Sequence, residues 1–309
     1  MAKTKKKATE STPNGSTNGS FKPKPSLAVA KTYKLYIGGK FPRTESGRVF
    51  KLHAADGGLV ANICQASRKD FRNAVVAARK AFSGWAGRTA YNRSQILYRM
   101  AEMLEGRSAQ FVEELVVMGV STKAAEAEVR AAIDRLVYYA GWADKYQQIF
   151  SAVNPVASSH FNFSVPEPTG VVSAFAPEKP GLLGLVSTIA PIITGGNTCV
   201  VLASKKFGTS AITFAEALHT SDLPGGVVNI LTGFRDELVS HFSSHMDVNA
   251  MVYCGDDAKE IVTIQENATS NLKRVRVYDD IDWNTDAGES PYFVMDTQET
   301  KTTWHPVGK

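Results

Sequence analysis

The stretch Gly170-Val-Val-Ser-Ala-Phe-Ala176 decides the fold, because it begins a regular series of short apolar runs. Four similar runs follow it, and each is separated from the next by enough residues for a helix. The predicted strands are 171–176, 198–202, 227–231, 250–253 and 274–277, and the predicted helices are 181–193, 209–219, 236–245 and 257–268. Apolar strands that alternate with helices predict an α/β fold with a Rossmann-like parallel sheet, covered on both faces.

The part of the chain before this series predicts short strands followed by helices. Leu35 and Ile37 alternate with polar or aromatic neighbours, which is typical of a strand. Ser67 with Asp70 three residues later resembles a capping box at the start of a helix. A further long helix is predicted over residues 123–150 from its apolar stripe.

Composition limits the classes of protein that fit. The chain has 309 residues with 43% hydrophobic character, enough for one large domain or two small ones. The sequence has no apolar run of about 18 residues and no secretory pattern at its start, so we expect a cytoplasmic protein without a membrane partner. Three widely spaced cysteines, Cys64, Cys199 and Cys254, predict buried reduced thiols rather than disulfides.

The net charge of +5 comes from the first 30 residues, which hold six lysines and one glutamate. This segment is rich in Ser, Thr, Asn, Gly and Pro, so we predict a disordered basic tail over residues 1–30. A solubilising tail is the plain interpretation, and a tether to nucleic acid or to a partner is the alternative.

Five motifs resemble aldehyde dehydrogenase sequence, and they occur in that family's order. They are Tyr138-Tyr-Ala-Gly-Trp-Ala-Asp-Lys145, Glu167-Pro-Thr-Gly-Val-Val172, Gly195-Gly-Asn-Thr198, Leu223-Pro-Gly-Gly-Val-Val-Asn-Ile230 and Ser244-His-Met-Asp-Val248. The resemblance covers roughly residues 33–280, and the closing stretch 293–306 resembles the strand that joins neighbouring subunits in that family. It implies a cofactor domain, a catalytic domain and a small antiparallel oligomerisation sheet.

The resemblance implies domain boundaries in this chain. The cofactor-binding domain is assigned to 31–157 and 167–282, and the oligomerisation strands to 158–166 and 291–309. The catalytic domain, which carries the reactive cysteine in the family, has no counterpart here. The predicted oligomerisation residues are Phe161, Phe163, Val165, Val294, Thr302 and Trp304. We expect exposed strand edges with such side chains to complete an intersubunit sheet, and the alternative is that they fold back on their own domain.

The positions that bind the cofactor in the family are altered in this chain. Glu178 and Lys179 stand where the family's Pro-Trp-Asn continues, and Leu202 and Lys205 replace the lysine and glutamate that hold ribose hydroxyls. Leucine cannot bond a hydroxyl, and lysine offers no acceptor. The degenerate cofactor-binding set is Pro177, Lys179, Ser204, Lys205, Gly233 and Gly255. We expect no cofactor, with weak binding of NAD or NADP as the alternative.

The catalytic groups are also replaced. No cysteine follows Cys254, and Tyr278 takes the position of the family's general-base glutamate. A tyrosine with a reference pKa near 10 is a poor base at neutral pH. His241 and His245 are four residues apart, but no third ligand follows at a useful spacing. We therefore predict no catalytic residue and no metal site.

Three hypotheses for function follow. The favoured one is an inactive aldehyde dehydrogenase paralogue that acts as a structural or regulatory subunit and oligomerises with itself or with a full-length aldehyde dehydrogenase. The second is an NAD(P)-dependent oxidoreductase subunit that supplies only the cofactor domain. The third is a binding module that uses the Lys-rich tail, although nucleic acid is not the expected partner.

Overall fold

The structure is a computed structural model that describes residues 30–308, so nearly all of the predicted tail lies outside the described residues. Its centre is a five-stranded parallel sheet in the order β10-β9-β6-β7-β8. These strands are β6 (Val171–Phe175), β7 (Thr198–Leu202), β8 (Val228–Leu231), β9 (Ala250–Cys254) and β10 (Arg274–Tyr278). The predicted α/β class is confirmed, and the strand order reverses at β6, which lies between β7 and β9.

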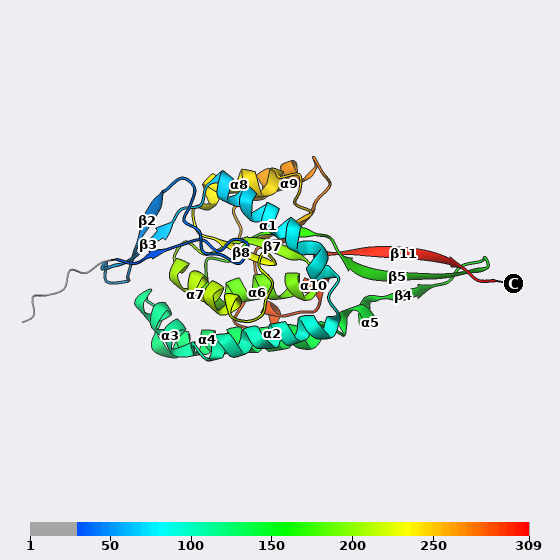
Figure 1. The fold of residues 1–309 in the computed structure, drawn as a ribbon, viewed down its shortest axis with the longest axis horizontal. Helices are drawn as coiled ribbons and strands as arrows, with labels where there is room; N and C mark the ends of the chain where they lie inside the picture. The colour runs from blue at the N-terminus through cyan, green and yellow to red at the C-terminus, as the bar shows by residue number, and fades with distance from the viewer. Residues whose placement is uncertain (1–29, 309) are drawn as a thin grey trace, which may run out of the picture.

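Helices cover both faces of this sheet, as Figure 1 shows. One face carries α1 (Arg68–Ala86), α8 (Arg235–Ser244) and α9 (Ala258–Ala268). The other face carries α6 (Gly181–Thr194) and α7 (Gly208–His219). A further layer packs below α6 and α7, and it consists of α2 (Ala90–Glu105), α3 (Ser108–Val117) and α4 (Thr122–Trp142). Successive strand residues therefore enter two apolar clusters, one above and one below the sheet.

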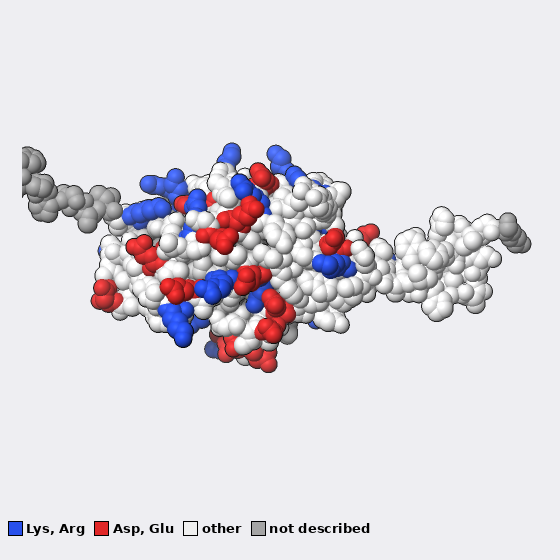
Figure 2. All heavy atoms as spheres, turned by 90° about the horizontal axis from the view of Figure 1, so that it is seen from below, with Lys and Arg blue, Asp and Glu red and all other residues white. Residues whose placement is uncertain are grey.

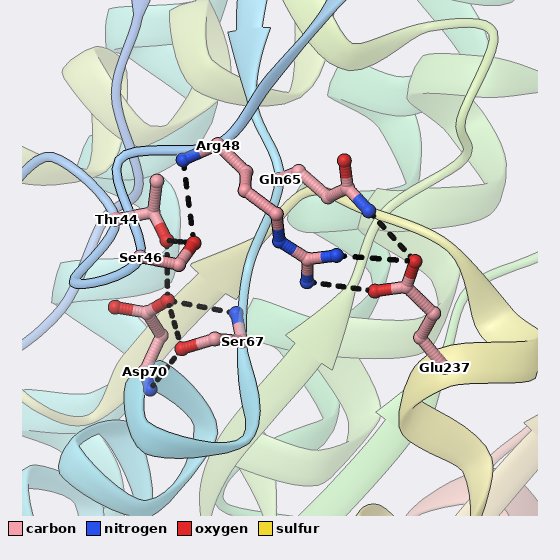
Figure 3. A network of polar contacts seen from close by, with 7 residues as sticks. All are labelled: Thr44, Ser46, Arg48, Gln65, Ser67, Asp70 and Glu237. Atoms are coloured by element: carbon pink, nitrogen blue, oxygen red, sulfur yellow. Dashed lines mark hydrogen bonds and ion pairs between the residues drawn. The ribbon is translucent and has the colours of Figure 1, made fainter.

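The first described strands form a small sheet of β1 (Thr32–Tyr33), β3 (Leu59–Cys64) and β2 (Val49–His53), in that order. The predicted capping box at the start of α1 is confirmed, because Ser67 and Asp70 bond each other's backbone N–H groups. The Asp70 carboxylate also accepts from the Thr44 hydroxyl at 2.6 Å (Figure 3). Nearby, Glu237 on α8 pairs with Arg48 at 2.8 Å and accepts from the Gln65 amide at 2.8 Å. These contacts fasten the small sheet to the helices above the main sheet.

A three-stranded antiparallel sheet, which we call the arm, projects from the body (Figure 1). It consists of β11 (Gln298–Pro306), β5 (His160–Pro168) and β4 (Ala152–Asn154), with β5 in the middle. All nine residues of β11 pair with β5, from Gln298 opposite Pro168 to Pro306 opposite His160. In the view of Figure 2 the outer part of the arm shows no Lys, Arg, Asp or Glu, and the charges gather on the body.

Two predicted elements differ from the structure. The helix predicted over 123–150 is broken into α4 and α5 (Tyr146–Phe150), with a turn at residues 143–145 between them. The predicted oligomerisation stretch 291–309 is a strand only from Gln298, because Tyr292–Met295 form the short helix α10. Val294 on that helix is fully buried in the body, so its assignment to an oligomerisation strand is wrong. The arm also begins earlier than predicted, since β4 belongs to it.

Candidate functional site

The carboxyl ends of β6, β9 and β10 meet at one edge of the main sheet, beside the reversal of strand order. Open α/β sheets bind ligands at such an edge. A hollow of about 300 Å³ lies there. Its lining is formed by Pro177, Glu178, Lys179, Arg235, Cys254, Gly255, Asp256, Tyr278, Asp279, Ile281 and Trp283. We call this hollow the carboxyl-edge cleft.

The Arg235 side chain lies across the carboxyl-edge cleft. Its guanidinium donates to the Cys254 carbonyl at 3.0 Å and to the Ala176 carbonyl, so it joins the ends of β9 and β6. The guanidinium carbon lies 5.7 Å from the ring centroid of Phe175 and 5.6 Å from that of Tyr253. The aromatic rings and the two backbone acceptors therefore fix the Arg235 guanidinium in this position.

Glu178 continues this bridge to the next strand. Its carboxylate pairs with Arg235 at 3.2 Å and accepts from the Ser204 hydroxyl at 2.9 Å. The backbone N–H of Lys205 donates to the same carboxylate at 3.2 Å. The Arg235–Glu178 pair therefore links the carboxyl ends of β9, β6 and β7 through side chains of the chain itself.

Carboxylates also occupy the start of α9, which faces the same edge. The Asp257 carboxylate accepts from the backbone N–H groups of Lys259 and Glu260 at 2.9 and 3.1 Å. The Glu260 carboxylate accepts from the Tyr253 hydroxyl at 2.5 Å. Burial, together with this bond to a carboxylate, raises the pKa of Tyr253. A helix N-terminus attracts anions, and here the chain supplies one of its own.

Cys254 and Tyr278, the thiol and the phenol at this edge, both hold their protons at neutral pH. Cys254 is 3% exposed, and burial raises the pKa of its thiol to about 12. Tyr278 donates its hydroxyl to Asp296 at 2.6 Å, and burial followed by the Asp296 charge raises its pKa. A thiol in this state has almost no thiolate at neutral pH, and the tyrosine holds its proton between two oxygens.

The predicted cofactor-binding residues are only partly brought together. Pro177, Lys179 and Gly255 line the carboxyl-edge cleft, and a Cβ on Gly255 would lie 2.9 Å from the Arg235 guanidinium. Ser204 donates its hydroxyl to the Glu178 carboxylate and is not part of the cleft lining. The Lys205 ammonium lies over the Phe234 ring at 4.4 Å, outside the cleft lining.

Gly233 is the sixth predicted residue, and it lies apart from the others. It packs at the junction with β3, where a Cβ would lie 3.3 Å from the Ala66 nitrogen. Close approach of two backbones, rather than a ligand, accounts for the glycine there.

The opposite edge of the sheet, at the amino ends of its strands, holds the base of the arm. The fully buried Asn197 accepts from the Gly170 N–H at 2.9 Å and donates to the Thr297 carbonyl at 2.9 Å. The Gln298 amide donates to the Gly195 carbonyl at 3.2 Å. These neutral bonds position the last residues before β11 on the body.

The predicted oligomerisation residues of the arm lie on its two opposite faces. Phe161, Phe163 and Val165 stand opposite His305, Thr303 and Lys301, and cross-strand partners share a face. Thr302 and Trp304 stand opposite Ser164 and Asn162, so they lie on the other face. Phe161 is 46% exposed and Trp304 is 58% exposed. Both faces of the arm therefore present a large apolar side chain to solvent.

Two classes of site are not found among residues 30–308. No helix there combines the length and the apolar character needed to cross a membrane. Within the same residues, no cluster of three or more His, Cys, Asp or Glu side chains is placed to hold a metal ion.

Sequence reasoning missed two buried charged residues on α4. Glu128 is 7% exposed, and its carboxylate accepts from the Leu182 and Leu183 N–H groups at 2.7 and 3.3 Å, at the start of α6. Arg135 is 4% exposed and holds the segment that leads to β11. The available signal was a charged residue at a position within the apolar stripe of the helix.

Comparison with known proteins agrees with this fold. A family model described as "Aldehyde dehydrogenase family" matches residues 41–278. An aldehyde dehydrogenase of Aspergillus niger is 30% identical over 272 residues, which cover 87% of this chain and 52% of that protein. Retinal dehydrogenase 2 of Gallus gallus is 33% identical over 260 residues, which cover 82% of this chain and 50% of that protein.

Solved structures give the same result. The NAD+ complex of an aldehyde dehydrogenase from Bacillus cereus superposes with a TM-score of 0.75 and 25% identity, covering 80% of this chain and 50% of that chain. PnpE from Pseudomonas sp. WBC-3 superposes with a TM-score of 0.75 and 27% identity, covering 80% and 50%. The chain thus spans about half the length of the proteins it matches.

Proposed function

The chain belongs to the aldehyde dehydrogenase family, and from that premise we propose that it is a catalytically inactive structural or regulatory subunit. It would oligomerise through its arm, either with a second copy or with a full-length aldehyde dehydrogenase. One observation carries the proposal: the carboxyl-edge cleft is bridged by the chain's own Arg235–Glu178 pair, while the arm is complete.

The residues of the carboxyl-edge cleft do not fit a dinucleotide. A pyrophosphate at the start of α9 would face the Asp257 and Glu260 carboxylates, and like charges at a few ångströms repel. Leu202 is 1% exposed and offers no hydrogen bond to a ribose. A ligand between β6 and β9 would also have to displace Arg235 from two backbone carbonyls.

The residues needed for aldehyde oxidation are likewise unsuited to it. Thioester chemistry needs a thiolate, and burial raises the pKa of Cys254 to about 12. Between β10 and β11 the sequence has only residues 279–297, which is too short for a domain. We therefore assign no reaction to this chain alone.

The arm supports a role in assembly. Its edge strand β11 is nine residues long, and Phe161, Val153 and Trp304 are 46%, 68% and 58% exposed. An exposed strand edge with large apolar side chains is a surface that pairs with another chain. The three described cysteines are free and buried, which supports the expected cytoplasmic setting.

The test uses the purified full chain. Light scattering gives its mass in solution, and calorimetry with NAD and NADP measures nucleotide binding. We expect an oligomer, or capture of the cell's aldehyde dehydrogenases, and no heat of binding. The variant F161S/F163S should weaken association at least about ten-fold, because hot-spot aromatic residues dominate interfaces. The matched control is V76S on α1, where Val76 is 59% exposed on the body.

Three results would contradict the proposal. A strictly monomeric chain that captures no aldehyde dehydrogenase would remove the assembly role. Tight nucleotide binding together with aldehyde turnover by the pure chain would remove the inactive role and favour the cofactor-domain subunit. If deletion of residues 1–30 alone abolished association with the partner, the result would favour the tail as the binding module.

A further inference from the structure

We propose that residues 279–297 form a latch that keeps β11 paired within its own chain, and that Arg135 is the residue that locks it. This segment follows directly on the residues matched by the family model, which end at 278. The inference goes beyond the proposed function, because it holds whichever partner the arm contacts.

The lock is a buried cation with several acceptors in the latch. Arg135 extends from α4 and donates to the Gly288 carbonyl and, at 3.3 Å, to the Trp283 carbonyl. It also pairs with Glu289 at 3.1 Å, while the Ser187 hydroxyl on α6 accepts at 2.5 Å. The Arg135 side chain is only 5% exposed. If these bonds are lost, the guanidinium or its acceptors remain as unpaired polar groups in the protein interior, which is costly in free energy.

The latch is packed as well as bonded. Trp283 is 4% exposed, and its backbone lies so close to Gly288 that a Cβ there would be 2.7 Å from the Trp283 Cα. The Tyr139 hydroxyl on α4 donates to the Ser290 carbonyl at 3.2 Å. Phe293 contacts the rings of both Tyr278 and Trp283, with centroids 5.0 and 6.0 Å apart. The segment is thus a folded connection rather than a loose loop.

The end of the latch fixes the register of β11. Val294 is fully buried in the core of the body, and three residues later the Thr297 carbonyl accepts from Asn197 and from the Thr169 hydroxyl at 3.1 Å. The next residue, Gln298, is the first of the nine that pair with β5. From Lys301 onward every described residue of β11 is exposed, so the body holds this strand only through its base.

Pairing of β11 with β5 makes the same backbone hydrogen bonds whether the two strands come from one chain or from two. What separates the two arrangements is the connection that delivers β11. A short, fixed connection makes pairing within one chain cheap in entropy, and a released one permits exchange of the strand between copies. The latch therefore decides which chain completes the arm.

Disulfide trapping tests this directly. The Ser164 and Thr302 hydroxyls lie 2.8 Å apart across β5 and β11, so the variant S164C/T302C places two thiols side by side. Oxidised at low protein concentration, this variant should form its disulfide within one chain and run as a monomer on a non-reducing gel. Adding R135A should raise the fraction linked between chains about ten-fold, because a released β11 can exchange. The matched control is R130A, on the same helix at an exposed position.

A milder variant keeps the test decisive if R135A does not fold. E289A removes only the ion pair at the 30%-exposed end of the lock, so it should shift the disulfides in the same direction by less. A disulfide formed mainly between chains in S164C/T302C itself would overturn pairing within one chain. An unchanged ratio of the two products in both R135A and E289A would overturn the lock. A shift toward disulfides between chains in R135A alone supports the lock. It would show that the backbone carbonyls, rather than Glu289, are the partners through which Arg135 acts.

Discussion

The two ends of the central sheet are built from different chemistry. At the carboxyl ends, charged side chains contact one another: Arg235 pairs with Glu178, and Asp257 occupies the start of α9. At the amino ends, the buried neutral amides of Asn197 and Gln298 hold backbone groups of Gly170, Gly195 and Thr297 and position the arm. A ligand edge needs open acceptors and donors, and an assembly edge needs rigidity. The contrast teaches that both ends of the central sheet are held rigidly by the chain's own side chains. The surface that is open to another molecule lies on the arm.

The largest effect is expected at the amino end, for N197A. The change leaves the buried Gly170 N–H without a partner and removes one of the bonds to the Thr297 carbonyl, which keeps its bond from the Thr169 hydroxyl. A buried group left unpaired costs about 1–3 kcal/mol, so with the second lost bond we expect a loss of about 3 kcal/mol in the free energy of unfolding. Urea denaturation measures it, with the exposed arm substitution T303A as the control. A loss no larger than that of T303A would show that the base of the arm is not rigidly held.

At the carboxyl end, R235A should cost less. The change removes two bonds to the carbonyls of Cys254 and Ala176 and leaves Glu178 without its cation. Because the Arg235 side chain is 18% exposed, water can replace some of the lost hydrogen bonds. We therefore expect the free energy of unfolding to fall by about 1–2 kcal/mol. The control is R274A, whose pair with Glu299 is 3.9 Å long and half-exposed.

The same variant sharpens the comparison by calorimetry. We expect R235A to bind neither NAD nor NADP, because Asp257, Glu260 and Leu202 remain in place. Nucleotide binding gained by this single change would mean that Arg235 alone closes the cleft, and that the edge is a ligand site blocked by one residue.

The sequence predicted the elements of the main sheet well and the contacts between them poorly. The strand over 198–202 was predicted with its observed bounds, because an apolar run between turn residues that is too short for a helix favours a buried strand. Helix α10 and the latch were missed, since the latch is held by Arg135 on α4, which is far from it in the sequence. Local patterns carry no information on such partners.

The candidate site shows the same division. The family resemblance predicts that Leu202, Lys205 and Tyr278 replace groups with defined roles, and the identity of a side chain decides whether it can bond a ribose hydroxyl. It did not foresee that Arg235 and Glu178 pair, because Glu178 follows β6 and Arg235 follows β8, and these two strands are not neighbours in the sheet. Val294 was misplaced for a related reason, as an apolar residue suits an exposed strand edge or a buried helix equally well.

A pH titration sharpens the comparison from the amino end, where Lys273 is 6% exposed and donates to the His245 carbonyl at 3.0 Å. Burial lowers the pKa of this lysine from its usual value to about 8. Above pH 8 the folded state therefore binds fewer protons than the unfolded state, and stability rises with pH in that window. From pH 7 to 9 the gain should be roughly 1 kcal/mol from this group.

The variant K273M isolates this contribution. The unfolding free energy of the parent chain minus that of K273M should rise by roughly 1 kcal/mol between pH 7 and 9. The comparison with K273M is needed because burial raises the pKa of thiols such as Cys254, and such groups lower stability as the pH rises above 9. Their contribution is the same in both proteins and cancels in the difference. A difference that stays constant with pH would mean that Lys273 is hydrated and that this end of the sheet is less rigid than Asn197 suggests.

The smallest effect on stability is expected on the arm, for W304S. Trp304 is 58% exposed and contacts the His160 ring at a centroid distance of 5.8 Å, so its removal should change the free energy of unfolding by less than about 0.5 kcal/mol. Trp304 lies on the face opposite Phe161, so comparing self-association of W304S with that of F161S identifies which face meets the partner. We expect at least one of the two to weaken association strongly while leaving the urea midpoint unchanged. If instead either change lowered the midpoint as much as N197A does, the arm would be a stabilising part of the body, and the contrast between a rigid sheet and an unpartnered arm would fail.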